Sequence, residues 1–248
     1  MSPEPDVPRI LVAVPVYNEQ KYVQQVISKI AEYAPADVLV IDDGSTDYTP
    51  ILLAMQPVDV IRHRTNLGYG RAIRDAFRWA QSYGYEWLIT MDCDEQHEPE
   101  ALGDFADAID ADDADVISGS RYLKDTPGVP PPPVERRKIN ATVTDWVNDR
   151  LGLNLTDAFC GFKAYRVSKL DDLELCVDGY AIPLQAWVQH AAAGHRVKEI
   201  PIKLIYNDPN RSFGGHLDDA ARRLAHYEKV FDAELAKYPD RFAAPAGR

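Results

Sequence analysis

Short apolar runs alternate with amphipathic stretches along the first half of the chain. The runs are rich in Val, Ile and Leu, which is the pattern of parallel strands buried on both faces of a sheet. Between them, apolar residues such as Val26, Ile27 and Ile30 recur at the spacing of a helix with one buried face. The pattern predicts strands at residues 9–16, 36–43, 58–63, 85–92 and 114–120, and helices at 19–33, 46–55, 67–83 and 99–109.

The pattern changes after Tyr122, where residues 124–135 are rich in proline and unsuited to helix or sheet. This segment is either a linker or a mobile flap beside a site. Beyond it, the periodicity predicts helices at residues 136–151, 182–193 and 217–238, and strands at 162–166 and 197–206.

Strands that alternate with helices in this way predict an α/β fold. We expect a doubly wound, mostly parallel central sheet with helices on both faces. The whole chain, residues 1–248, is expected to be a single domain with two halves, at residues 9–123 and 124–238.

Composition narrows the class of protein. The chain has 46% hydrophobic residues, enough for a sizeable core, and a net charge of -12, which argues against nucleic acid as the main partner. Its three cysteines are odd in number and show no zinc-binding spacing, and a reducing, cytosolic compartment is the simplest interpretation. The sequence has neither a signal peptide nor an apolar run of the ~20 residues that span a bilayer. We therefore expect a cytoplasmic protein, with peripheral contact at the cytoplasmic membrane face as an alternative.

The sequence MDCDEQHEPE, residues 91–100, follows a predicted buried strand and places Asp92 and Asp94 at its end. Carboxylates crowded at a half-buried strand end repel one another, and one would have to protonate unless a cation intervened. Mg²⁺ and Mn²⁺ take oxygen ligands, and Mg²⁺ is commonly held by one or two carboxylates together with substrate phosphates. The aspartate pair therefore predicts a metal ion bound with a diphosphate.

Polar motifs also follow the other predicted strands: PVYNE, DDGSTD, NLGYG and SGSRY. In open α/β sheets, ligands bind beyond the carboxyl ends of the strands. Each motif alone also fits a turn or a helix cap. The chain has neither GxxxxGK[ST] nor GxGxxG after its first strand, which excludes the P-loop and the dinucleotide fingerprint. Asp42 or Asp43 could instead accept hydrogen bonds from a ribose or a base.

Taken together and in order, PVYNE, DDGSTD, NLGYGRA, MDCDEQH and SGSRY resemble family 2 glycosyltransferases of the GT-A fold. The later segments DAFCGFKAY, GYAIPLQ and KEIPIKLIYNDPNRSFGG resemble the dolichol-phosphate mannose synthase and polyprenyl-phosphate glycosyltransferase branch. The resemblance covers about residues 9–216. It implies a nucleotide-sugar-binding half at residues 9–123 and an acceptor-side half at 124–238, with residues 124–135 as the flap.

The resemblance also implies roles for individual residues on the donor side. Asp92 and Asp94 would hold Mg²⁺ or Mn²⁺, with Gln96 as a further polar group near the metal. The donor would be a GDP- or UDP-hexose. Its expected contacts are Pro15, Tyr17, Glu19, Asp42, Asp43, Gly68, Asp92 and Arg121.

On the acceptor side, the resemblance implies that cations meet the phosphates. Arg121 and one of Arg136 or Arg137 would neutralise the diphosphate or an acceptor phosphate, and Arg211 would close over the site. The segment NDPNRSFGGH lacks the lysine of the R-x-x-G-x-S-K run of mannose synthases, and the sequence lacks the C-terminal membrane helices of some relatives. Both departures concern the lipid acceptor more than the donor.

The implied reaction is inverting transfer of a hexose from a nucleotide diphosphate sugar to a polyprenyl phosphate. A phosphate acceptor needs no general base, whereas a sugar hydroxyl does. Asp157 is the candidate base, with a cap or loop carboxylate as its alternative role. Similarly, the basic residues 136–138 either meet a lipid phosphate at a membrane surface or form an ordinary charged helix start.

Three other functions stay open. The first is transfer to a soluble saccharide or metabolite. The second is a sugar nucleotidyltransferase, which the absence of a Gly-rich, basic loop after the first strand disfavours. The third is a non-catalytic nucleotide-binding module, which would not need both Asp92 and Asp94.

Overall fold

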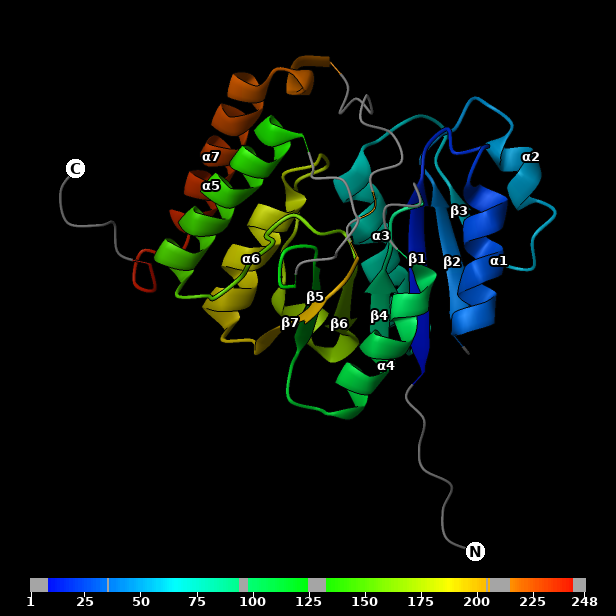
Figure 1. Ribbon diagram of the computed structural model, residues 1–248, viewed down its shortest axis with the longest axis horizontal. Coiled ribbons are helices and arrows are strands. Elements are labelled where there is room, and N and C mark those ends of the chain that lie inside the picture. Colours follow the sequence, from blue (N-terminus) through cyan, green and yellow to red (C-terminus); the bar gives the residue numbers. More distant parts are fainter. Residues whose placement is uncertain are drawn as a thin grey trace, which may run out of the picture.

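The computed structural model describes residues 9–34, 36–93, 98–124, 133–203, 205 and 215–242. Within these residues, seven strands form a single sheet (Figure 1). They are β1 (Ile10–Val16), β2 (Asp37–Asp42), β3 (Asp59–Arg62), β4 (Trp87–Thr90), β5 (Val116–Ser120), β6 (Lys163–Arg166) and β7 (Val197–Pro201). Their order in the sheet is β3-β2-β1-β4-β6-β5-β7.

Strand β6 is the antiparallel member of this sheet. It pairs with β4 on one side and with β5 on the other, both in the antiparallel sense, while the other neighbouring pairs are parallel. Ala164 lies opposite Ile89 on β4 and Ile117 on β5. The predicted mostly parallel α/β sheet is therefore confirmed, and strands from residues 9–123 and 124–238 are interleaved in it.

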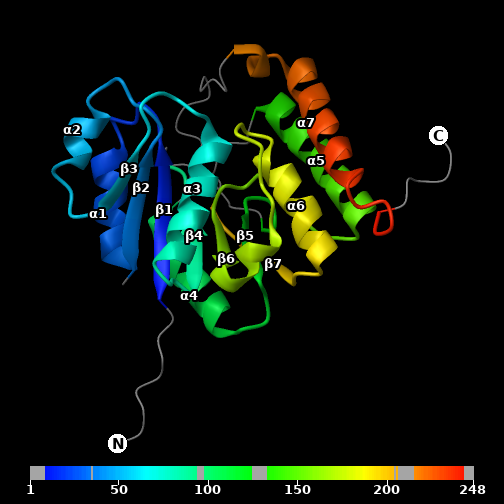
Figure 2. The ribbon, with the colours of Figure 1, turned by 180° about the vertical axis from the view of Figure 1, so that it is seen from behind.

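Helices cover both faces of the sheet (Figures 1 and 2). One face carries α1 and α4, and the other carries α3 and α6, with α5 and α7 packed against α6. The helices are α1 (Val23–Tyr33), α2 (Thr49–Leu53), α3 (Tyr69–Ser82), α4 (Leu102–Asp110), α5 (Val134–Leu151), α6 (Ile182–Ala193) and α7 (Ala220–Leu235). None of the helices in the described part of the chain is long and apolar enough to cross a membrane.

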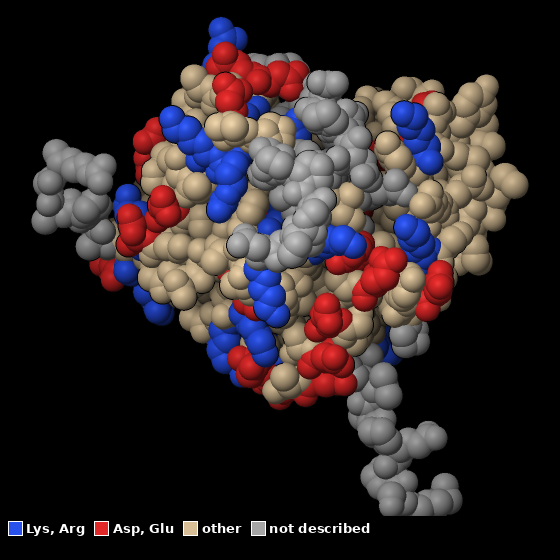
Figure 3. Space-filling model, viewed as in Figure 1, with Lys and Arg blue, Asp and Glu red and all other residues tan. Residues whose placement is uncertain are grey.

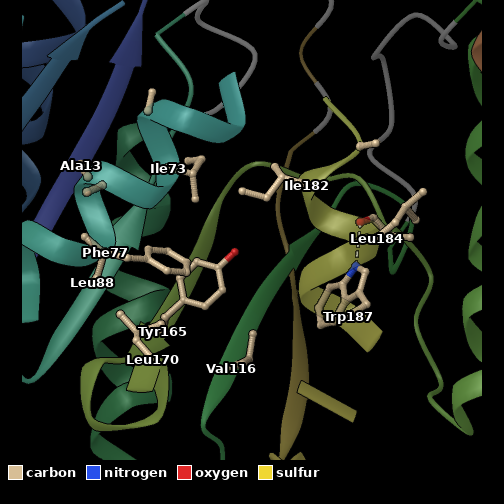
Figure 4. Close-up of a cluster of buried hydrophobic side chains, with 14 of the residues drawn as sticks. Ala13, Ile73, Phe77, Leu88, Val116, Tyr165, Leu170, Ile182, Leu184 and Trp187 are labelled. Atoms are coloured by element: carbon tan, nitrogen blue, oxygen red, sulfur yellow. Dashed lines mark hydrogen bonds between the residues drawn. The ribbon is translucent and has the colours of Figure 1, made fainter. Parts of the chain in front are cut away.

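Alternation along the strands divides the core into two clusters. Leu11 and Ala13 of β1 point to the α3 and α6 side, and Val12 and Val14 point to the α1 and α4 side. Figure 4 shows part of the first cluster, in which the rings of Phe77 and Tyr165 pack edge to face at 5.0 Å. In the same cluster the indole of Trp187 donates a hydrogen bond to the Ala158 carbonyl at 2.9 Å. The hydrogen bond gives the buried indole N–H a partner.

Several predicted boundaries are wrong. Helix α7 is three residues shorter than predicted at each end, and α5 begins at Val134, inside the predicted flap. Residues 125–132 of that flap lie outside the described residues. Helix α1 begins at Val23, because residues 19–22 form a turn in which the Glu19 carbonyl accepts the Val23 N–H. Helix α2 begins at Thr49 instead of residue 46, because residues 45–47 are bonded to Asn18. The last predicted strand, residues 197–206, ends at Pro201 as β7.

Candidate active site

The carboxyl ends of β1 to β4 meet at one edge of the sheet. In the parallel register, Val16 lies opposite Asp42, and Asp42 lies opposite Arg62. The Met91 N–H continues the β4 pairing by donating to the Ala13 carbonyl. Residues 17–19, 42–47, 62–68 and 91–92 are therefore neighbours, as the carboxyl-end rule predicts.

Asn18 joins the loops that follow β1 and β2. Its backbone is left-handed, with φ 57°, and its N–H donates to the Ser45 hydroxyl at 2.9 Å. Its side-chain oxygen accepts from the N–H groups of Thr46 at 2.8 Å and Asp47 at 3.3 Å. Asn tolerates this backbone region better than most residues, and these bonds fix the rim of the site.

Asp42 lies fully buried at the end of β2. One of its carboxylate oxygens, Oδ1, accepts the Ser45 N–H at 2.8 Å. The other, Oδ2, lies 3.2 Å from Nε of Arg62 but receives no hydrogen bond within the described residues. A buried carboxylate oxygen without a donor is costly, and a ligand N–H or O–H would remove that cost. The predicted neighbours Pro15, Tyr17 and Glu19 lie on the adjacent β1 end, where Tyr17 is half exposed and Glu19 is buried.

Asp43 has a different environment from Asp42. Its oxygens accept the N–H groups of Leu67 and Gly68, both at 2.8 Å, and Oδ1 lies 2.6 Å from Nδ1 of His63. The carboxylate thus holds the loop between β3 and α3. The Asp43 carboxylate and the Gly68 N–H are thus bonded to other groups of the protein. For this reason we assign no ligand contact to Asp43 or to Gly68.

Asp92 follows β4 and is half-buried. The Tyr69 hydroxyl donates to its Oδ1 at 3.2 Å. Burial and the charge of Asp92 raise the pKa of Tyr69 well above its usual value, so this hydroxyl keeps its proton. Gly161 also lies against the carboxylate, where a Cβ atom would overlap both oxygens. The carboxylate is therefore held by a hydroxyl donor and by close backbone packing.

The carboxylate of Asp92 is a hard oxygen ligand of the kind that Mg²⁺ and Mn²⁺ prefer, and its place at the strand ends fits such an ion. Asp94 and Gln96, the other predicted metal-site residues, lie outside the described residues, as does Arg211. No group of three His, Cys, Asp or Glu side chains that could hold a metal occurs within the described residues. The structure thus places one of the predicted ligands and leaves the others as predictions.

Arg121 and Asp157 form a buried ion pair between the end of β5 and the turn before β6. The guanidinium of Arg121 donates through Nε to Oδ2 at 2.6 Å and through Nη2 to Oδ1 at 2.9 Å. The Asn140 amide, on α5, donates to Oδ1 at 2.8 Å. The side chain of Asp157 is fully buried and that of Arg121 is 13% exposed. This two-bond geometry fixes the plane and direction of the guanidinium.

This pairing argues against Asp157 as a general base. Burial alone would raise the pKa of Asp157, but Arg121 and the hydrogen bonds from Arg121 and Asn140 lower it to about 2. A carboxylate with so low a pKa accepts a proton poorly near neutral pH. Asp157 instead holds Arg121 in place, a role closer to the structural alternative expected from the sequence.

The two predicted acceptor-side arginines lie in the first turn of α5. The Arg137 guanidinium packs over the Tyr122 ring at 3.7 Å from its centre, and Arg121 lies 5.6 Å from the same ring. Arg137 therefore lies near Arg121, since both guanidinium groups contact the Tyr122 ring. Figure 3 shows both Lys and Arg and Asp and Glu side chains on the face of the molecule seen in Figure 1. Cations are therefore available at the site despite the net charge of -12.

Sequence reasoning missed four residues that shape the site: Asn18, His63, Tyr69 and Asn140. Asn18 and Tyr69 stood inside quoted motifs, PVYNE and NLGYG, and the glycines on both sides of Tyr69 were the available signal for a closely packed side chain. His63 and Asn140 carried no local signal, because their partners Asp43 and Asp157 are distant in sequence.

Comparisons with known proteins agree with the resemblance. A family model described as glycosyl transferase family 2 matches residues 11–174. An undecaprenyl-phosphate mannosyltransferase of Micrococcus luteus is 32% identical, over 88% of this chain and 93% of that protein. A polyprenol monophosphomannose synthase of Mycolicibacterium smegmatis is also 32% identical, over 88% of this chain and 86% of that protein.

Among solved structures, the fold is similar to that of glucosyl-3-phosphoglycerate synthase from Mycobacterium tuberculosis in complex with Mn²⁺, UDP and phosphoglyceric acid. The TM-score is 0.68, the alignment covers 97% of this chain and 80% of that chain, and the sequences are 16% identical. At this identity the likeness concerns the fold, and it confirms the predicted GT-A-like architecture.

Proposed function

The chain belongs to glycosyl transferase family 2, and from this premise we propose that it transfers a hexose, with inversion, from a nucleoside diphosphate sugar to a polyprenyl phosphate. The names of the two relatives that are 32% identical support this acceptor class. The same acceptor class was expected from the motifs of the second half of the chain.

The observation that carries the proposal is the pairing of Asp157 with Arg121. A hydroxyl acceptor must lose a proton to a base during attack, whereas a phosphate monoester arrives already ionised. The carboxylate that sequence reasoning offered as a base is bound to a guanidinium and has a pKa of about 2. The arrangement therefore favours an acceptor that needs no base.

On the donor side, we assign the nucleoside to the ends of β1 and β2, where Pro15, Tyr17, Glu19 and Asp42 lie. The buried Oδ2 of Asp42 would accept a hydrogen bond from the ribose or the base. Asp92, with Asp94 and Gln96, would hold Mg²⁺ or Mn²⁺, which would supply charge neutralisation for the departing diphosphate.

The arginines of the site act on phosphate charge. Asp157 holds the Arg121 guanidinium through Nε and Nη2. The other N–H groups of the guanidinium are therefore oriented before substrate binds, and such preorganised donors stabilise developing charge effectively. Arg137, beside Tyr122, is proposed to meet the acceptor phosphate, and Arg211 is proposed as a further cation of the site. Bringing an anionic acceptor toward an anionic donor requires such cations, because like charges repel at close range.

Transfer of label tests the proposal. Purified protein is incubated with Mn²⁺ and radiolabelled GDP-mannose, UDP-glucose or UDP-N-acetylglucosamine, with a short-chain polyprenyl phosphate in detergent or with soluble saccharides. Label in an organic-extractable product that depends on the polyprenyl phosphate supports the proposal. Transfer to a soluble acceptor alone would replace it with the second candidate. Pyrophosphate release from a nucleoside triphosphate and a sugar phosphate would indicate a nucleotidyltransferase.

The proposed role of Arg137 in binding the acceptor phosphate is tested by substitution. Arg137→Ala should raise the KM for polyprenyl phosphate about tenfold, in the range of a lost charge-assisted hydrogen bond, and leave the KM for the donor within about twofold. Lys229→Ala, which removes an exposed cation from α7, outside the basic residues 136–138, is the control.

A further inference from the structure

Tyr69 was not among the predicted site residues, yet its hydroxyl contacts the proposed metal ligand Asp92. It is the first residue of α3, whereas Asp92 follows β4, so the contact joins two elements that are separate in the chain. Tyr69 also lines a cavity between α3 and α6 with Thr90, Gly161, Lys163 and Tyr165. The contact therefore lies where the donor edge of the sheet meets the second half of the chain.

The position of Tyr69 is fixed by its neighbours. Gly70 donates its N–H to the Asp178 carbonyl at 2.7 Å. A Cβ at Gly68 or Gly70 would overlap the backbone of residues 177–179. The Tyr69 ring stacks on Tyr180 with 5.6 Å between centres and 17° between planes. The hydroxyl is thus presented to Asp92 by a rigid support and not by a freely rotating side chain.

The Asp92 carboxylate also packs closely against Gly161, where there is no room for a side chain. A carboxylate at the end of an aspartate has two rotatable bonds and several rotamers in an open site. Here the Tyr69 hydroxyl donor and the nearby Gly161 backbone restrict that choice of rotamer. The hydroxyl does so as a neutral group, so the negative charge that would attract a dication is kept.

We infer that Tyr69 is a positioning residue for metal binding: its hydroxyl orients the Asp92 carboxylate toward the dication. This inference rests on the proposed function, because it takes Asp92 as a metal ligand. Groups that hydrogen-bond to metal ligands orient them, and their removal typically weakens metal binding by about 10- to 100-fold. Tyr69 acts through Asp92 and does not itself touch the reacting atoms in this account.

Direct metal binding tests the inference. Binding of Mn²⁺ in the presence of GDP or UDP is measured by electron paramagnetic resonance for the wild type, Tyr69→Phe and Tyr165→Phe. Tyr69→Phe keeps the ring and its stack on Tyr180 and removes the hydroxyl. It should weaken Mn²⁺ binding about tenfold. Tyr165→Phe removes a buried hydroxyl from the lining of the same cavity and should leave the affinity within about twofold.

Kinetics supply a second readout. At saturating Mn²⁺, Tyr69→Phe should recover kcat to within about threefold of the wild type, because the ligand itself is still present. An unchanged Mn²⁺ affinity in Tyr69→Phe, or an equal loss in Tyr165→Phe, would overturn the inference. Wild-type protein that binds no Mn²⁺ with either nucleotide would instead refute the metal site of the proposed function, so the two failures are distinguishable.

Discussion

The ion pair between Arg121 and Asp157 lies buried at the candidate site. Taking two charges out of water is costly, and such a pair is tolerated only when both partners are well bonded. Asp157 meets that condition through two bonds from the Arg121 side chain and one from Asn140. The contribution of this ion pair to the stability of the fold therefore depends on both charges being present.

Removing one charge should be far more damaging than losing an exposed ion pair. Asp157→Asn keeps the shape of the side chain but leaves the Arg121 guanidinium, 13% exposed, without its counter-charge. We expect a loss of about 3–5 kcal/mol in the free energy of unfolding, measured by urea denaturation at pH 7. Asp113→Asn, which breaks the exposed pair with Lys198, is the control and should change stability little. Equal midpoints for Asp157→Asn and the wild type would contradict this account.

The same carboxylate predicts how stability changes in acid. The pKa of Asp157 is about 2 in the folded protein, against about 3.9 for an unperturbed aspartate. Because the unfolded chain binds this proton more tightly, the stability that Asp157 provides is fully present above about pH 4 and is lost as the pH falls toward 2. Urea denaturation between pH 5 and 2 should therefore give a flatter dependence for Asp157→Asn than for the wild type. Parallel curves would show that Asp157 does not titrate in this range.

At the scale of elements, the start of α3 packs unusually closely against residues 177–179. Gly70 is the second residue of the helix, and a Cβ there would overlap the Val177 carbonyl. Gly103 occupies the same position in α4 and has open space around its Cα. A substitution at Gly103 therefore measures helix propensity alone, whereas the same substitution at Gly70 also measures the cost of a steric overlap.

Alanine substitution should have opposite effects at these two glycines. Gly103→Ala should stabilise the protein by about 0.5–1 kcal/mol, the usual gain of replacing glycine in a helix. Gly70→Ala should destabilise it, because the α3 start must move away from residues 177–179, and we expect a loss of about 1–3 kcal/mol. Thermal unfolding of both variants measures the difference. A Gly70→Ala variant that is more stable than the wild type would show that residues 177–179 can move to make room for the added methyl group without loss of stability.

The sequence predicted elements best where the local pattern was complete. Helix α6 was predicted at residues 182–193, as observed, since Pro183 suits its first turn and Gly194, with φ 73°, suits its end. The start of α2 was missed because Asn18, nearly thirty residues away, bonds residues 46 and 47. Local periodicity contains no information about such distant bonds.

In the candidate site, too, local motifs were informative and distant contacts were not predicted. Motifs at strand ends led correctly to a shared edge of the sheet, since parallel strands bring their carboxyl ends together. The pairing of Arg121 with Asp157 could not be predicted from the sequence, because 36 residues separate them. They meet only because β6 runs antiparallel to β5, so that the chain before β6 lies beside the end of β5. The role of Asp157 was therefore left open between base and structural carboxylate until its partner was known.

At the scale of the whole molecule, a buried polar network connects α6, α7 and residues 174–177. The Gln185 and Gln189 amides each donate to the Glu234 carboxylate at 2.7 Å. The same two side chains accept N–H groups of Glu174, Cys176 and Val177. Since residues 177–179 contact the start of α3, the C-terminal helix is linked through this network to the donor side of the site.

Removing Glu234 should loosen both segments that the network joins. Glu234→Ala leaves two buried amide groups without an acceptor, at an expected cost of about 1–3 kcal/mol each. Hydrogen exchange followed by mass spectrometry should show faster exchange in α7 and in residues 173–178, with β1 and β2 unchanged. Glu228→Ala, at an exposed position of α7, is the control. Faster exchange in α7 alone would show that residues 173–178 are held independently.

The place of β6 in the sheet has a consequence for biosynthesis. A nascent chain that has emerged only as far as Arg121 contains β1 to β5 and all the donor-side residues, yet the strand that must lie between β4 and β5 has not been made. Until residues 163–166 leave the ribosome, β4 has an open edge and β5 has no neighbour, a state prone to misassociation. Translation that stops before Lys163 would therefore yield a fragment without the middle of its sheet, not a smaller nucleotide-binding protein.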